Sequence, residues 1–240
     1  MKHSKMFRPR ALALTVAVSL GALSGCSTVT SHAYNAWNNI KSLAVFQRTS
    51  NETYGVDIVA HPGANFGMVG TLVANLDLIT KTSRLTTALD PKTTALQERL
   101  AVRLAQALKA DGYDSSVVAL APGNGAGQAP LPSHISSLAD AYITMDLKAE
   151  YIAAGPTSDY IPYVKVNISQ NDSRTGKILY QDTLTYGYNH EGMPSIHLPC
   201  EDKYHFKDID SLLSDPGKAR EGLQAGVDAI VAQIASDLQR

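Results

Sequence analysis

Residues 139–150 read ADAYITMDLKAE, and this stretch decides the class of fold. Two sets of side chains alternate along it. The first set is apolar and comprises Ala141, Ile143, Met145, Leu147 and Ala149. The second set is mostly polar and comprises Tyr142, Thr144, Asp146, Lys148 and Glu150. An alternation with a period of two predicts a β-strand that packs one face on a core and turns the other to solvent.

Two further strands are expected directly after this one. Val164, Val166 and Ile168 alternate with polar residues, and residues 177–188 repeat the strand composition. Between them, residues 171–176 read NDSRTG, which is typical of a turn. Short connections of this kind favour antiparallel neighbours, so the sequence predicts three consecutive antiparallel strands.

Two amphipathic helices are expected on either side of this strand group. Each begins with an Asp-Pro pair, which places a capping carboxylate before a proline in the first turn. The first apolar stripe comprises Leu96, Leu100, Leu104 and Leu108. The second comprises Leu223, Val227, Ile230, Ile234 and Leu238. These stripes predict helices over about 91–111 and 216–239, and Gly222 and Gly226 are expected to allow close approach of the second helix.

Together these elements predict an α+β fold, in which a largely antiparallel sheet is covered by two amphipathic helices. The length is that of a single domain over residues 53–240. Residues 54–60 and 116–120 are expected to add short strands. Residues 66–89 are apolar, rich in threonine and interrupted by two glycines, so helix and strand both stay open for them. Residues 190–214 are expected to be irregular.

The N-terminus has the layout of a secretory signal peptide. Residues 1–10 carry four basic residues and no acidic one, and an apolar run then small residues follow. The run is shorter than the roughly 20 apolar residues of a transmembrane helix. Residues 23–26 read LSGC and resemble the lipobox of bacterial lipoproteins. The resemblance implies cleavage before Cys26 and lipid on Cys26, whereas an ordinary signal with a chance cysteine is the alternative.

The lipobox resemblance also implies where the protein is located. Residues 1–25 would be the signal peptide, and residues 26–52 a lipid-anchored tether within which residues 33–43 could form a short helix. Several acyl chains on one residue, such as palmitate, would hold the chain on a membrane almost permanently. Ser27 is not the aspartate that favours inner-membrane retention in enteric bacteria. The resemblance therefore implies the outer membrane, with the domain facing the periplasm.

Charge and composition argue against nucleic acid as a partner. Removal of residues 1–25 takes four basic residues from the 21 basic and 22 acidic residues of the chain, and leaves a formal net charge of −5. Nucleic-acid binding depends on neutralising phosphates, and no cluster of Lys and Arg is present. Residues 123–127 read GNGAG, but prolines follow and no lysine does. We therefore expect no nucleotide and no other cofactor.

Residues 190–205 contain the side chains that would suit a metal. The candidates are His190, His197, Cys200 and His205. Imidazole and thiolate are ligands of zinc and copper. The segment lacks the paired short spacings of a zinc finger, so a histidine-rich surface loop is the favoured interpretation. If Cys26 carries lipid, Cys200 is a lone thiol in an oxidising compartment.

No arrangement of residues in the sequence indicates a catalytic site. Ser195 lies in a context unlike a nucleophile elbow. Asp208, Asp210 and Asp215 lie near helix starts, where capping accounts for them. We therefore expect a protein that is not an enzyme.

The order of elements is similar to that of small periplasmic lipoproteins of envelope assembly, namely the curli-secretion lipoprotein and the lipoprotein activators of penicillin-binding proteins. The resemblance rests on residues 96–112, 139–188 and 223–238. It implies a non-enzymatic accessory or binding role, with an envelope protein as partner besides the membrane. The alternative is an exported metal-binding protein or enzyme that uses residues 190–205.

Overall fold

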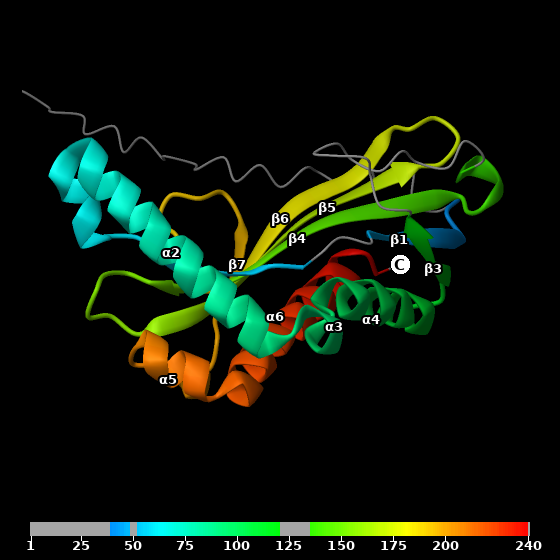
Figure 1. The fold of residues 1–240 in the computed structure, drawn as a ribbon. Coiled ribbons are helices and arrows are strands. Elements are labelled where there is room, and N and C mark those ends of the chain that lie inside the picture. The colour runs from blue at the N-terminus through cyan, green and yellow to red at the C-terminus, as the bar shows by residue number, and fades with distance from the viewer. Residues whose placement is uncertain (1–38, 49–51, 121–134, 240) are drawn as a thin grey trace, which may run out of the picture.

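The computed structural model describes residues 39–48, 52–120 and 135–239, except for the side chains at positions 64 and 66. These residues form a mixed seven-stranded sheet with helices on one face (Figure 1). The strands are β1 (Ser42–Arg48), β2 (Tyr54–Ile58), β3 (Asp114–Leu120), β4 (Ala141–Ala153), β5 (Tyr160–Asp172), β6 (Ile178–Gly187) and β7 (Ile196–Leu198). The helices are α2 (Gly67–Leu89), α3 (Pro91–Thr94), α4 (Leu96–Ala110), α5 (Ile209–Ser214) and α6 (Pro216–Asp237), with 3-10 turns η1 (Pro62–Phe66), η2 (Ile135–Ser137) and η3 (Asp202–Tyr204). The α+β class expected from the sequence is confirmed.

The three central strands pair as the sequence predicts. β4 and β5 are antiparallel along their whole length, and β5 continues antiparallel with β6. The carboxylate of Asp172 closes the turn between β5 and β6, because it accepts the backbone N–H groups of Arg174 and Thr175. The centre of the sheet is therefore built from local connections that a sequence pattern can reveal.

The margins of the sheet are parallel, which makes the sheet mixed. β1 pairs with residues 141–143 and β2 with residues 149–153, so the two strands follow one another along the same edge of β4. β3 pairs in parallel with β1, and β7 with β6. Parallel partners usually need long crossovers, although residues 188–195 join β6 to β7 directly, and the composition of a strand does not reveal its direction of pairing.

Strand β1 corrects the expected boundary of the tether. Its central residues Leu43, Ala44, Val45 and Phe46 are at most 2% exposed. A strand buried on both faces reads as a continuous apolar run and not as an alternation, so the period-two criterion does not detect it. The carboxylate of Asp140 accepts the N–H groups of Lys41 and Ser42 and holds the start of β1 beside β4. The end of the short helix expected over 33–43 is thus strand, and residues 33–38 lie outside the described part.

The helix expected over 91–111 is interrupted once. Ala95 adopts a left-handed backbone with φ of 42°, and this separates α3 from α4. The carboxylate of Glu52 caps the new helix start by accepting the N–H groups of Leu96 and Gln97. A carboxylate in this position also complements the positive end of the helix. This cap lies more than 40 residues away in sequence, which is why no local motif predicted it.

Helices α4 and α6 pack side by side on one face of the sheet and form the main core (Figure 1). Leu104 of α4 and Ile230 of α6 are fully buried, as their stripes predicted. The close approach expected at Gly226 is also confirmed, because a Cβ there would lie 2.6 Å from Cδ1 of Tyr186 and 2.8 Å from Cγ2 of Val164. The backbone of the terminal helix therefore approaches the sheet so closely at position 226 that only glycine fits without a shift of its neighbours.

The opposite face of the sheet carries a second, smaller cluster. It comprises Ala44, Phe46, Leu120, Ala139 and Tyr142. Tyr142 was expected on the solvent face, but its ring lies on that of Phe46 with the centroids 5.6 Å apart. Farther along β4, Asp146 is exposed as expected.

Residues 190–214 are more regular than the sequence predicted. They contain β7, η3 and α5, and α5 begins with a capping box between Asp208 and Ser211. Phe206 exchanges two backbone hydrogen bonds with Tyr160 and so fastens the segment to the start of β5. Elements of three to six residues leave no periodic signal, which explains why they were missed.

Candidate functional site

Residues 67–89 form the single helix α2, so the ambiguity between helix and strand is settled. Gly70 and Ala74, on the side of its first half that faces the protein, are small and buried. Leu78 also packs against the main core, but the other six large apolar residues of positions 68–79 point outward. They are Met68, Val69, Leu72, Val73, Leu76 and Ile79, and they are between 57% and 91% exposed. We call these six residues the apolar face of α2.

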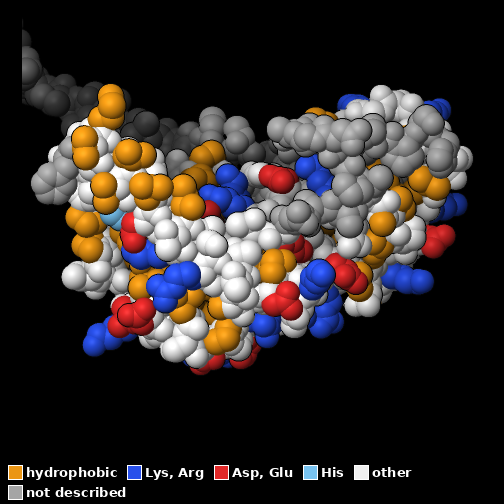
Figure 2. All heavy atoms as spheres, in the orientation of Figure 1, with side chains coloured by type: hydrophobic (Ala, Val, Ile, Leu, Met, Phe, Trp, Pro, Cys, Tyr) orange, Lys and Arg blue, Asp and Glu red, His pale blue; other side chains and the backbone are white. Residues whose placement is uncertain are grey.

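The apolar face is contiguous on the surface. It is part of the orange group at the upper left of Figure 2, over the end of α2 that projects from the rest of the fold in Figure 1. Single exposed apolar residues are ordinary, whereas larger contiguous apolar patches mark interaction sites. Among the described residues, no helix has the length and hydropathy that crossing a bilayer requires.

Threonines hold α2 against the edge of strand β2. The hydroxyl oxygen of Thr86 accepts the N–H of Tyr54 at 3.0 Å, and that of Thr82 accepts the N–H of Val56 at 3.0 Å. These bonds satisfy backbone groups that would otherwise be open along a sheet edge. Threonine is a mediocre helix former, and the pairing with β2 gives a structural reason for Thr82 and Thr86 in this helix.

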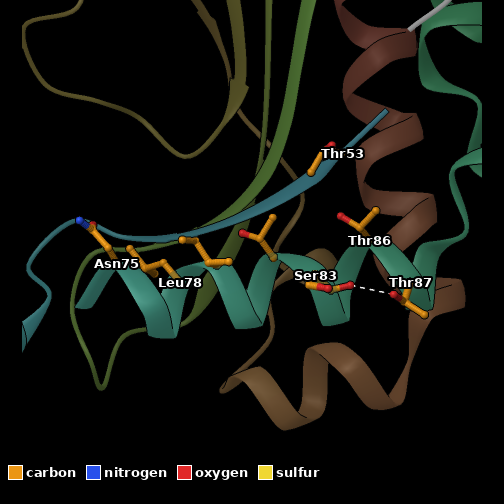
Figure 3. A pocket seen from close by; sticks show the side chains of 8 residues that line it. Thr53, Asn75, Leu78, Ser83, Thr86 and Thr87 are labelled. Carbon is orange, nitrogen blue, oxygen red and sulfur yellow. Dashed lines mark hydrogen bonds between the residues drawn. The ribbon is translucent and has the colours of Figure 1, made fainter. Parts of the chain in front are cut away.

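A shallow groove of about 640 Å³ runs along the second half of α2 (Figure 3). It is lined by Thr53, Asn75, Leu78, Ile79, Thr82, Ser83, Thr86 and Thr87. None of these side chains is charged, and most present hydroxyl groups. Ile79 belongs both to the groove and to the apolar face, so the helix changes along its length from an apolar to a hydroxyl-rich surface.

A small charged cluster lies on the side of α2 that faces the protein. The carboxylate of Asp77 accepts Nζ of Lys81 at 2.6 Å and lies 3.2 Å from Nε2 of His61. Partial burial alone would raise the pKa of Asp77, but the hydrogen bonds from Lys81 and His61 outweigh it and lower that pKa. Nδ1 of His61 accepts the N–H of Gly63, so the same ring caps η1. The cluster fixes the turn that leads into α2.

The four candidate metal ligands of residues 190–205 do not converge. The ring of His190 packs edge-on against Tyr163 and Tyr188, with centroids 5.1 and 5.0 Å away. Nδ1 of His197 lies 3.5 Å from the hydroxyl of Thr185. Sγ of Cys200 lies 3.3 Å from Nε2 of His205, and these two are the pair that comes together. In the described part of the chain, no group of three or more His, Cys, Asp or Glu is gathered as a metal would need.

Cys200 is half-buried and packs against the main core, not fully exposed as its loop setting suggested. Burial raises the pKa of its thiol, and the neighbouring charge of Asp202 raises it further. A thiol with a raised pKa is a poor nucleophile at neutral pH. Cys26, the predicted lipid site, lies outside the described residues.

Sequence reasoning missed the apolar face of α2 as a site. The available signal was the absence of any Asp, Glu, Lys or Arg over residues 58–76, combined with large apolar residues. That signal alone does not tell a buried segment from an exposed one. The burial pattern of the folded chain was needed to separate them.

No protein-family model and no curated protein matches the sequence. Several solved structures are distantly similar. A homolog of the neuraminyllactose-binding hemagglutinin from Helicobacter pylori is 11% identical, with a TM-score of 0.41 over 83% of this chain and 84% of that chain. A dodecamer of PelC from Paraburkholderia phytofirmans is 13% identical, with a TM-score of 0.33 over 83% and 88%. A protein described as a lipoprotein from Caulobacter crescentus is 9% identical, with a TM-score of 0.29 over 60% and 80%. At these values the similarities carry no argument about function.

Proposed function

We propose that this chain is a lipid-anchored protein of the bacterial cell envelope with a non-enzymatic accessory or binding role. Its binding surface is the apolar face of α2. The observation that carries the proposal is the outward position of six large apolar side chains, each at least 57% exposed. A contiguous surface of this kind favours association, so it is expected to be covered when the protein is in its working environment.

Burial of this face contributes enough free energy to offset the cost of association. Full burial of one Val, Leu, Ile or Met side chain contributes roughly 1.5–3 kcal/mol relative to exposure. Association has its own cost in lost freedom of motion, and several such side chains offset it. The face lies on a helix that threonines fasten to β2, so little ordering is needed when it binds.

The N-terminus supports attachment to a membrane. Residues 23–26 resemble a lipobox, and lipid on Cys26 leaves residues 27–41 as the tether to β1. A fully extended tether of this length spans at most about 50 Å. Ser27 favours the outer membrane, with the domain in the periplasm. The anchor therefore keeps the apolar face within reach of envelope components.

The metal-binding or enzymatic alternative has less support. Cys200 and His205 offer two ligands, whereas a zinc site takes three or four from the protein. His190 and His197 are occupied with aromatic and hydroxyl neighbours. We therefore place the function in binding and not in the segment 190–205.

The anchor is tested by Cys26→Ala. The variant should leave the membrane fraction or accumulate as an uncleaved precursor, and mass spectrometry of the parent should find acyl chains on Cys26. An unmodified mature N-terminus at another residue would remove the basis of the anchor.

The binding surface is tested by the double variant Leu72→Asp/Leu76→Asp. Both side chains are exposed, so the variant should fold like the parent and lose the crosslinks, to lipid or to protein, that we expect the parent to form through this face in intact envelopes. Thr87→Asp, on the same helix beyond the apolar face, is the matched control and should keep them. An unchanged crosslinking pattern in the double variant would contradict the proposal.

A further inference from the structure

The segment that forms the N-terminal tip of α2 carries no charged side chain, although Lys207 and Asp208 follow Phe206 beside the turn between β4 and β5. Residues 58–76, which lead through η1 into the first half of α2, contain no Asp, Glu, Lys or Arg. The turn between β4 and β5 lies beside them, because Val59 and Ala60 donate N–H groups to the carbonyls of Ala153 and Ala154. In that turn, residues 154–159 contribute Asp159 as the single charged side chain.

The shape of this tip distinguishes a flat partner from a helical one. The first half of α2 projects from the body of the fold, so its surface is convex (Figure 1). At 3.6 residues per turn, the apolar face spreads over an arc of roughly 140°. That arc is wider than a coiled-coil seam and equals the stripe of a helix on a protein core, but the tip is convex and uncharged, so a membrane plane can cover it without a matching groove.

We infer that the tip of α2, comprising Met68, Val69, Leu72 and Val73, lies in the surface of the lipid bilayer. This inference deepens the proposed function and rests on it, since the lipid on Cys26 brings the domain to the membrane. Interfacial helices usually carry Lys and Arg that attract anionic lipid. The tip has none, so its binding is apolar and independent of lipid charge.

Distances along the chain allow two points of attachment in one plane. β1 starts opposite Ala141 of β4, and the tip lies beyond Ala153 at the other end of that strand. The separation along β4 is about 40 Å at 3.3 Å per residue. The tether reaches about 50 Å when extended. The lipid and the tip can therefore enter the same membrane while the described domain lies between them.

The test is quenching of an introduced tryptophan by brominated lipid. The full-length lipidated chain would carry Trp37→Phe, which removes its single tryptophan, together with Leu72→Trp or, as matched control, Thr87→Trp. Both positions are exposed, so both variants should fold. Each is reconstituted into zwitterionic phosphatidylcholine vesicles with brominated acyl chains. Because an interfacial helix sinks about 5–10 Å, Leu72→Trp should lose most of its emission and Thr87→Trp little.

Other occupants give different results. If the vesicles float with the protein and neither tryptophan is quenched, the inference is overturned while the lipid anchor stands. A blue shift of Leu72→Trp without quenching that grows with protein density would assign the face to a second copy and also overturn it. If the protein does not float with the vesicles, both the anchor and the two-point attachment fail. Equal quenching in phosphatidylglycerol vesicles is expected, and a requirement for anionic lipid would contradict the apolar mechanism.

Discussion

Helices α2 and α6 are nearly equal in length but place their large side chains in opposite ways. In α6, Leu223, Val227, Ile230 and Ile234 are fully buried. In the first half of α2, the six residues of the apolar face are exposed, and Gly70 and Ala74 face the protein. Gly222 and Gly226 of α6 also face the sheet, but there the neighbouring large residues share the buried side. The difference separates a helix that holds the fold together from one whose large apolar side chains the fold leaves exposed, and we propose that these are covered in the envelope.

The largest expected effect contrasts Ile230→Ala with Leu72→Ala. Truncation of a fully buried Leu or Ile costs about 2–5 kcal/mol of unfolding free energy, and Leu104→Ala should behave like Ile230→Ala. Leu72 is 61% exposed, so Leu72→Ala should change stability by less than about 0.5 kcal/mol. Chemical denaturation measures all three. Equal losses at positions 230 and 72 would mean that α2 is a core helix.

Gly226→Ala should destabilise the packing of α6 on the sheet. The added Cβ would meet Tyr186 and Val164 at 2.6 and 2.8 Å, and overpacking of this kind costs about 1–3 kcal/mol. Gly217→Ala, in the first turn of the same helix, has Oδ1 of Asp215 at 3.5 Å as its nearest contact and should be nearly neutral. Thermal melts of the two variants would show whether α6 depends on close approach.

Removing the hydroxyls that pair α2 with β2 should cost less. Thr82→Val and Thr86→Val keep the shape of the side chain but leave the N–H groups of Val56 and Tyr54 without their acceptors, at about 1 kcal/mol each. Thr87→Val removes a bond to the carbonyl of Ser83 within the helix and should have little effect. If the three variants unfold at the same denaturant concentration, the helix is held by other contacts.

The smallest effect is expected at Cys200. Cys200→Ser keeps a polar atom beside His205 and should change stability by about 0.5 kcal/mol or less. The parent should run as a monomer on non-reducing gels, because burial raises the pKa of the thiol and limits its reactivity. A reducible dimer would make Cys200 an intermolecular link, and stabilisation of the parent by zinc would favour a metal role.

The parts of the fold that sequence could predict are those whose signal is local. β4 to β6 alternate along short connections, α4 and α6 carry periodic apolar stripes, and Asp215 caps α6, so the residues of these elements predict them. The sequence did not predict β1, because that strand is buried on both faces. It did not predict the cap from Glu52 either, because the N–H groups that Glu52 accepts lie more than 40 residues away in sequence. The apolar face of α2 was not predicted for a different reason. An uncharged apolar stretch has the same composition whether it lies inside or outside, and its exposure depends on the whole fold.

The central claim is that the apolar face of α2 is exposed by the fold and covered in the envelope. The most direct measurement compares maleimide labelling of Leu72→Cys and Thr87→Cys in intact envelopes, each in a Cys200→Ser background. The two rates are divided by those of the denatured chain, which removes intrinsic differences between the two thiols. The account predicts that Leu72→Cys is protected at least about tenfold more than Thr87→Cys, the factor that corresponds to 1.4 kcal/mol of covering. Equal normalised labelling rates at positions 72 and 87 would contradict this claim.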